Sequence, residues 1–366
     1  MFKTGIEITK SPKTRLNAAI LENPGFGVYF SDHMFSMEYV SGAWQNARIM
    51  PFGSIEVSPA MAVLHYGQAV FEGLKAFRSD GAEEAGAGGG AVNIFRPEKY
   101  HARLLRSCER LCIPPVSYDA FMAGITELVR IDKAWVPEKK GHSLYIRPFI
   151  LATDEFLGVR VSETYRFLII ASPVGAYYKE GMNPVRLTTS GKYVRAAKGG
   201  LGEAKTPANY AASLLPAEEA KKKGFTQVLW LDGVERRYIE EVGTMNMFFV
   251  IGDELITPAL DGTILGGVTR ASVLELAKDW GVKTVERRIG IDEVFEAAGK
   301  GTLKEAFGTG TAAVISSVGS ISHEGREIKI NDGKTGELSR KLFDAITGIQ
   351  CGAEPDHRGW RHKVKV

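Results

Sequence analysis

The sequence predicts a two-domain α+β protein, and three observations support this. The chain has 366 residues, which is enough for two domains of roughly 150 residues or more. Both halves mix strand-like and helix-like segments. Residues 175–184 contain turn-forming residues without a hydrophobic period, which marks a connection. We therefore expect an N-terminal domain over 1–176, a connection over 177–188 and a C-terminal domain over 189–366.

The N-terminal half is expected to combine strands with one prominent helix. Apolar and polar residues alternate over 25–39, which predicts two strands around a Ser-Asp-His turn. Pro97 opens a helix with an apolar stripe. Residues 145–151 and 165–172 are apolar strands, and the Gly- and Ala-rich stretch 79–90 is a surface loop.

The C-terminal half is expected to hold short strands interrupted by two helices. The strands are Val185 to Thr189, Gln227 to Leu231, Met247 to Val250, Glu254 to Thr257, and Ala312 to Val318. One helix follows Asn209, and Pro216 should kink or shorten it, because an interior proline costs about 3 kcal/mol. The other helix begins after Arg270 and ends at Gly281.

Composition narrows the class of protein. A hydrophobic fraction of 44% with 24% charged residues is typical of a soluble enzyme or binding protein. The net charge of +3 is too small to indicate a nucleic-acid partner. No apolar run approaches the ~20 residues that span a bilayer, and the three cysteines form no disulfide framework. We expect a cytoplasmic protein without a membrane or nucleic-acid partner, whose Trp360 docks the basic end onto the body.

The segment from Arg195 to Tyr210 carries the most chemistry. Its glycines leave backbone N–H groups open to a phosphate. The Lys205 amine can attack an aldehyde if burial and nearby cations lower its pKa, the alternative being a solvated lysine. Glu241, before a Gly-Thr turn, can face a pyridine nitrogen and keep that ring protonated. An amine, a phosphate cradle, a phenol and a carboxylate are the groups that bind pyridoxal phosphate.

Two glycine-rich turns are candidate anion sites. Residues 266–270 precede a helix, so the amides of Val268 and Thr269 suit a phosphate. The turn 308–313 can hold a carboxylate or a phosphate oxygen. His65 is expected to pack rather than act as a base, and no metal site or Ser-His-Asp arrangement can be assembled.

A nucleotide-binding P-loop is the nearest alternative. Residues 199–206 almost match its pattern, but Ala204 stands where glycine is needed. The preceding residues 187–194 are too polar for a buried strand, and Pro207 should disturb the helix that would collect the phosphates.

Taken together and in order, the motifs match a family. They are Phe30 to Met34, His65 to Lys75, Phe95 to Pro97 with Arg103 to Ser107, Tyr145 to Pro148, Val194 to Ala197, Lys205 with Asn209 and Tyr210, Tyr238 to Asn246, Gly266 to Arg270, and Gly308 to Ala312. The chain resembles the branched-chain amino acid aminotransferases, fold-type IV enzymes dependent on pyridoxal 5'-phosphate. The resemblance implies a two-domain α+β architecture with the active site at the domain interface. It also implies amino transfer from leucine, isoleucine or valine to 2-oxoglutarate.

The resemblance also implies roles for single residues. Lys205 bonds the cofactor aldehyde and moves the substrate proton, Tyr210 contacts the phenolic oxygen, and Glu241 pairs with the pyridine nitrogen. The phosphate is held by Arg103, Val268, Thr269 and Thr311, with Arg195 close by. The substrate is bound by Phe30, Tyr66, Phe71, Tyr145, Arg147, Leu157, Val159, Tyr177, Thr244, Thr311 and Ala312. Tyr66, Leu157 and Val159 match residues inserted from a neighbouring subunit, which implies a homodimer.

Two departures from the family pattern stand out. Pro207 and Ala208 replace a usual Gly-Gly pair between the lysine and Asn209, so the local backbone has less freedom. Residues 313–316 lack a C-x-x-C pair, so no thiol control is expected there. A D-amino acid transaminase or an aminodeoxychorismate lyase would share Lys205 and Glu241, and a catalytically idle relative is a third alternative.

Overall fold

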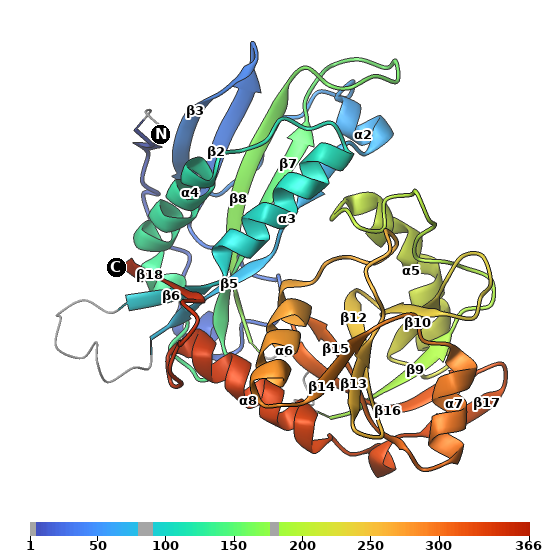
Figure 1. Cartoon of the computed structure of the whole chain (residues 1–366). Helices are drawn as coiled ribbons and strands as arrows, with labels where there is room; N and C mark the ends of the chain where they lie inside the picture. Colours follow the sequence, from blue (N-terminus) through green and yellow to red (C-terminus); the bar gives the residue numbers. More distant parts are fainter. Residues whose placement is uncertain (1–4, 80–90, 176–182) are drawn as a thin grey trace. The chain divides into compact units, whose positions relative to one another are not determined.

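The computed structural model describes residues 5–79, 91–175 and 183–366. The chain forms two compact units, each with its own sheet (Figure 1). The first comprises Met1–Tyr177, Ala204–Pro207 and Thr347–Val366, and the second comprises Tyr178–Glu203 and Ala208–Ile346. The first half of the predicted connection, 177–182, lies outside the described residues, and 185–188 belong to a strand. The domain boundaries stay a prediction.

The sheet of the first unit is almost entirely antiparallel. Its strands run in the order β1-β3-β2-β8-β7-β5-β6-β18, with β4 beside β7, and only β1 and β3 are parallel. Their bounds are β1 Glu7–Ile8, β2 His33–Val40, β3 Ala43–Pro51, β4 Ala69–Phe71, β5 Leu74–Arg78, β6 Ala91–Phe95, β7 Ser143–Ala152, β8 Tyr165–Val174 and β18 Arg361–Lys365. The predicted strands at 145–151 and 165–172 are confirmed within β7 and β8.

Two long helices pack on this sheet (Figure 1). Helix α3 (Pro97–Arg110) has Pro97 in its first turn, as predicted, and buries Leu104 and Cys108. Helix α4 (Tyr118–Ile131) is capped by Ser117, whose Oγ accepts from the Ala120 N–H at 3.2 Å. The shorter helices are α1 (Ala18–Glu22), α2 (Ala62–Tyr66) and the 3₁₀ helix η2 (Lys133–Trp135).

One predicted strand is wrong, and one predicted docking is confirmed. Residues 25–32 are not a strand, because Gly25 and Gly27 adopt φ of 65° and 68°, which breaks an extended backbone. Trp360 is 4% exposed and lies under the Arg96 guanidinium, 4.4 Å from the ring centroid. The basic end therefore docks onto the first unit, as β18 paired with β6. The predicted loop 79–90 lies almost wholly outside the described residues.

The sheet of the second unit closes on itself. Its order is β11-β10-β9-β16-β15-β12-β13-β14, and β11 also pairs with β12, so the strands from β11 to β12 form a ring. The bounds are β9 Val185–Thr189, β10 Gln227–Leu231, β11 Ile239–Val242, β12 Met245–Ile251, β13 Glu254–Thr257, β14 Lys283–Glu286, β15 Leu303–Gly310, β16 Val314–His323 and β17 Arg326–Lys329. The five predicted strands of this half are confirmed, the last beginning at Val314. Its core includes Leu187, Leu229, Met247, Phe249 and Ile321.

The helices of the second unit are α5 (Pro207–Lys222), α6 (Val268–Asp279), α7 (Ile291–Gly299) and most of α8 (Glu337–Cys351), with the 3₁₀ helix η3 (Asn331–Gly333) before α8. Helix α6 confirms the helix predicted before Gly281, but it begins at Val268 and not after Arg270. Helix α5 continues through Pro216 to Lys222, so the prediction that this proline shortens it is wrong. Proline at position 207 begins the helix instead of disturbing it, since its fixed φ suits a first turn.

Candidate active site

The backbone N–H and the backbone carbonyl of Lys205 are both hydrogen-bonded. Its N–H donates to the Ser107 Oγ of α3 at 2.9 Å, and its carbonyl accepts from the Phe71 N–H at 3.0 Å. Residues 204–207 belong to the first unit although they lie in the second half of the sequence. These bonds fix where the lysine side chain starts.

The surroundings of Lys205 make its amine easier to deprotonate. Burial and then the Arg103 guanidinium lower the pKa of Lys205 to about 8, while Glu72 opposes this shift. The Nζ atom lies 4.7 Å from the centroid of the Phe71 ring. We call Phe71, Glu72, Arg103, Tyr145, Arg147 and Lys205 the lysine cluster. Lys205 is half-buried, and its contacts within this cluster count against the alternative of a solvated lysine.

Arg103 makes a bidentate pair with Glu72 inside this cluster. Its Nε and Nη2 donate to the two carboxylate oxygens at 2.8 and 2.7 Å, and both side chains are buried. Arg103 was predicted from the sequence as a site residue, whereas no role was predicted for Glu72. The signal for Glu72 is a charge directly after the apolar strand β4.

Tyr145 and Arg147 lie on one face of β7 and join the lysine cluster. The Arg147 Nη2 donates to the Tyr145 hydroxyl at 3.1 Å, and its guanidinium lies 4.8 Å from the Phe71 ring centroid. A Cβ at Gly73 would lie 1.8 Å from that hydroxyl, so a side chain there would displace the Tyr145 ring. Lys75 pairs with Tyr145 across the sheet, and burial lowers its pKa to about 8. The sequence missed this second buried lysine.

Glu241 lies on β11 in a small pocket of the second unit. Its Oε2 is 2.7 Å from the Arg195 Nε, and its Oε1 accepts from the Leu265 N–H at 2.8 Å and the Asn246 Nδ2 at 3.3 Å. We call this the carboxylate pocket, and it is lined by Arg195, Asn209, Tyr210, Ser213, Glu241, Gly243, Thr244 and Leu265. The structure thus brings together four predicted residues and adds Asn246, which the sequence analysis missed.

Arg195 is engaged by protein groups on all sides of its guanidinium. Besides Glu241, it donates from Nη1 to the Thr263 carbonyl at 2.7 Å and from Nη2 to the Gly202 carbonyl at 3.1 Å. Its described contacts are with Glu241 and two loops, and a role beside the phosphate stays a prediction.

The two candidate anion sites lie at the start of α6 and in the turn that follows β15. Val268 and Thr269 form the first turn of α6, whose N-cap Gly267 offers no side-chain cap to these amides. A Cβ at Gly267 would lie 2.0 Å from the Asn246 Oδ1, so a side chain there would displace Asn246. Thr311 and Ala312 lie in the short turn between β15 and β16, which ends at Val314 with φ of 62°.

The remaining predicted residues are spread over the first unit. Phe30 stacks on Phe52 at 4.9 Å between ring centroids. Tyr66, Leu157 and Val159 are exposed, and the Tyr66 hydroxyl donates to the Leu157 carbonyl. Tyr177 lies outside the described residues.

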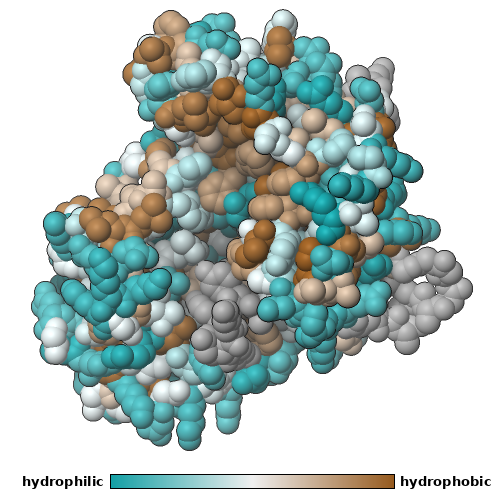
Figure 2. Space-filling view, turned by 180° about the vertical axis from the view of Figure 1, so that it is seen from behind, coloured by the Kyte–Doolittle hydropathy of each residue, from teal (hydrophilic) through white to brown (hydrophobic). Residues whose placement is uncertain are grey.

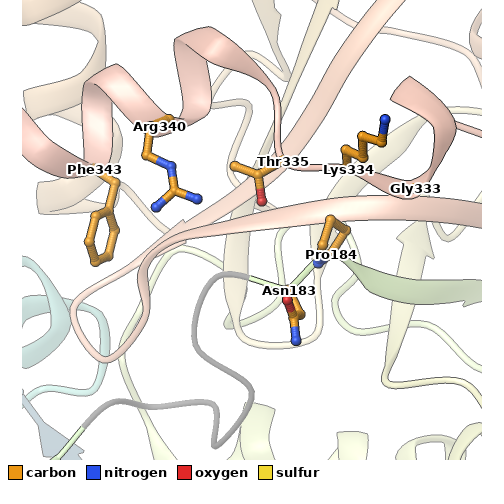
Figure 3. Close-up of a pocket in the computed structure, with 7 residues that line it drawn as sticks. All are labelled: Asn183, Pro184, Gly333, Lys334, Thr335, Arg340 and Phe343. Carbon is orange, nitrogen blue, oxygen red and sulfur yellow. The ribbon is translucent and has the colours of Figure 1, made fainter.

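A separate cavity of about 500 Å³ contains none of the predicted residues (Figure 3). It is lined by Asn183, Pro184, Gly333, Lys334, Thr335, Arg340 and Phe343. Its cations, Lys334 and Arg340, are exposed. Among the described residues, no helix is both long and apolar enough to cross a membrane. Over the same ranges, no three His, Cys, Asp or Glu side chains are grouped to hold a metal ion.

Comparison with known proteins identifies the family. The model of the amino-transferase class IV family matches residues 69–321. Branched-chain-amino-acid aminotransferase 2 of Bacillus subtilis (strain 168) is 52% identical over 357 residues, covering 97% of this chain and 95% of its own. The solved branched-chain amino acid aminotransferase of Escherichia coli has a TM-score of 0.74 and 28% identity, covering 91% of this chain and 99% of that one. Another solved branched-chain amino acid aminotransferase, complexed with N-(5'-phosphopyridoxyl)-L-glutamate, has a TM-score of 0.70 and 27% identity, covering 89% of this chain and 97% of its own.

The chain therefore belongs to the class IV aminotransferases. The predicted resemblance to the branched-chain amino acid aminotransferases is confirmed, and with it the fold-type IV architecture and the dependence on pyridoxal 5'-phosphate. The nucleotide-binding alternative is excluded by this family and by the fold. No described strand leads directly into residues 199–206, since β9 ends at Thr189.

Proposed function

We propose that this enzyme transfers the amino group of leucine, isoleucine or valine to 2-oxoglutarate, giving branched-chain 2-oxo acids and L-glutamate. The observation that carries the proposal is the Lys205 amine, whose pKa lies near 8 within a fold of this family. A base works best when its pKa is close to the working pH. Lys205 Nζ can therefore take the proton from the substrate Cα and return it.

The residues present fit pyridoxal 5'-phosphate. We infer that Lys205 holds its aldehyde carbon, Tyr210 its phenolic oxygen and Glu241 its ring nitrogen. The phosphate is assigned to Arg103, to the amides of Val268 and Thr269, and to Thr311. When bound, the cofactor supplies an electron-withdrawing ring that stabilises negative charge at the substrate Cα.

The lysine cluster suits both substrates. The rings of Phe71 and Tyr145 offer an apolar wall to a branched side chain, and Phe30 is assigned to the same wall. Arg147 places a cation over Phe71, which suits the distal carboxylate of 2-oxoglutarate. Thr311 and Ala312 are assigned to the α-carboxylate, and Thr244 to the side-chain pocket.

An exposed apolar surface supports a homodimer. Leu64 and Tyr66 of α2 are 60% and 44% exposed, and Leu157 and Val159 of the adjacent loop are 64% and 85% exposed. The two segments touch, because the Phe156 N–H donates to the Ala60 carbonyl at 3.2 Å. Apolar side chains gather at the top of the view in Figure 2, the end of the first unit that carries α2. A contiguous apolar patch is typical of a protein interface, so we infer that a second copy covers it.

We also propose a reducing compartment, the cytoplasm. Cys108, Cys112 and Cys351 are thiols that form no disulfide in the described part of the chain, and disulfides are rare in the cytoplasm.

The test compares Lys205→Ala with Lys198→Ala, a matched control because Lys198 is exposed in the same loop. We expect the Lys205 variant to lose both the visible absorbance of bound cofactor and turnover of L-leucine with 2-oxoglutarate. Lys198→Ala should keep both. Borohydride reduction of the wild type should leave the cofactor on the Lys205 peptide in mass spectra. An unlabelled peptide, or an active Lys205→Ala variant, would refute the proposal.

A substrate panel tests specificity. L-leucine, L-isoleucine and L-valine should turn over, whereas D-alanine and aminodeoxychorismate should not. Turnover of either of the last two as the best substrate would contradict the assignment.

A further inference from the structure

We propose that Arg195 is a positioning residue that holds the Glu241 carboxylate as an oriented anion and so decides whether the cofactor ring nitrogen stays protonated. This inference rests on the proposed function, in which Glu241 faces that nitrogen. It gives Arg195 a different task from the phosphate contact that the sequence suggested.

The Arg195 guanidinium has three partners, which hold it and the Glu241 carboxylate in fixed positions. The Arg195 Nε lies 2.7 Å from the Glu241 Oε2, while its two terminal nitrogens donate to the carbonyls of Thr263 and Gly202. A guanidinium is planar, so three partners around its edge fix both its position and its plane. The carboxylate bound to that edge is fixed with it.

The opposite oxygen of Glu241 is held separately. Its Oε1 accepts from the Leu265 N–H at 2.8 Å and from the Asn246 Nδ2 at 3.3 Å. Asn246 also donates to the Leu265 carbonyl at 2.8 Å. The carboxylate is thus gripped at both oxygens, from strands and loops of one unit.

Close backbone approach makes this arrangement possible. A Cβ at Gly202 would lie 2.2 Å from the Thr263 carbonyl oxygen, so these two loops meet only because residue 202 has no side chain. The two carbonyls that bind Arg195 come from this contact. The loop that follows Arg195 therefore supplies part of the support for its own guanidinium.

The charge of Arg195 is needed because the pair is buried. Glu241 is 2% exposed and Arg195 is 9% exposed. A buried carboxylate without a countercharge tends to take up a proton and become neutral. A neutral Glu241 would no longer favour a positive charge on a ring nitrogen in front of it. Removing Arg195 should therefore reduce the protonation of the ring nitrogen indirectly, through Glu241.

The test uses holoenzyme loaded with cofactor that is ¹⁵N-labelled at the ring nitrogen. We expect the wild type to give the chemical shift of a protonated nitrogen, and Arg195→Met to move it toward the unprotonated value. Glu241→Gln should produce the same movement. The kcat of Arg195→Met should fall by about 10- to 100-fold, as for partners that orient a functional ligand, while KM for L-leucine stays within about threefold.

Arg287→Met is the matched control. Arg287 is a half-buried arginine of the second unit that bonds one carboxylate, Glu293, and one carbonyl, Arg288. Its loss should reduce stability and leave the ¹⁵N shift unchanged, which separates positioning from general damage. If Arg195→Met does not fold, Arg195→Lys decides, because an ammonium keeps the charge but cannot make three coplanar bonds. An intermediate ¹⁵N shift is expected for it.

Failure of this inference and failure of the proposed function would give different results. A wild-type ¹⁵N shift in every folded Arg195 variant would overturn this inference and leave the proposed function intact. A wild type whose ring nitrogen is unprotonated, or which binds no cofactor, would overturn the proposed function itself.

Discussion

Arg103 and Glu72 form a fully shielded ion pair, with two parallel bonds of 2.8 and 2.7 Å between α3 and the end of β4. Glu72 has no exposed surface, and Arg103 is 5% exposed. The pair therefore ties the helix to the sheet directly beside Lys205. The positive charge of Arg103 lowers the pKa of that lysine, and the negative charge of Glu72 raises it.

Breaking the pair should cost stability. Arg103→Met leaves the Glu72 carboxylate buried without its countercharge, which costs about 3–5 kcal/mol. We expect this loss in the urea unfolding of the cofactor-free protein. The double variant Glu72→Gln/Arg103→Met should recover part of it, because no lone charge remains. A double variant as unstable as the sum of both single changes would contradict the coupling.

The reaction of Lys205 with aldehydes should report its pKa. Only the neutral amine attacks, so the rate at which cofactor-free protein takes up pyridoxal 5'-phosphate should rise with pH and level off above a midpoint of about 8. Arg103 lowers this pKa and Glu72 raises it. Glu72→Gln should therefore shift the midpoint to lower pH and Arg103→Met to higher pH, measured by stopped-flow absorbance. Shifts in the reverse directions would argue against this electrostatic account.

Lys75 should lower the free energy of unfolding near neutral pH. Its folded pKa of about 8 lies below the 10.5 of an exposed amine, so the unfolded chain binds the proton more tightly. Stability should therefore rise as pH increases from 8 to 10.5. Lys75→Met should remove the Lys75 share of this rise, leaving the share of Lys205, and be more stable at pH 7 by up to about 3 kcal/mol. Lys198→Met, at an exposed site that leaves Lys75 in place, should keep the pH dependence of the wild type in thermal unfolding.

Gly202→Ala should separate the two loops that support Arg195. The new Cβ would meet the Thr263 backbone oxygen at 2.2 Å, whereas a Cβ at Gly191 meets nothing within 4 Å. We expect Gly202→Ala to lower the melting temperature and weaken cofactor binding, and Gly191→Ala to change neither. Equal behaviour of the two variants in differential scanning fluorimetry would show that the contact is unimportant.

Periodicity predicted most of the second sheet. Strands such as β10 and β13 have short apolar runs bounded by turns, and their bounds match the structure. Residues 25–32 show the limit of this approach. Their alternation looked like a strand, but two glycines with positive φ turned the backbone away. Helices α4, α7 and α8 were not assigned from the sequence.

The site was predicted only where a residue lies in a recognisable motif. Lys205, Tyr210 and Glu241 stood out. The structure leaves Lys205 half-buried beside Arg103 and Glu72, and it gathers Tyr210 and Glu241 in the carboxylate pocket. Their partners were missed, because Glu72 and Asn246 act through contacts with residues far along the chain or across a strand pair. Local patterns cannot reveal such pairings, and which element a side chain meets is decided by the tertiary fold.

The edge strand β18 has a consequence for how the protein is made. It pairs along all of β6, from Arg361 opposite Phe95 to Lys365 opposite Ala91, and the whole second unit lies between them in the chain. During synthesis on a ribosome, the edge of β6 that pairs with β18 therefore stays unpaired until the second unit has been made. Long-range pairing of this kind is slow and leaves nascent chains prone to association.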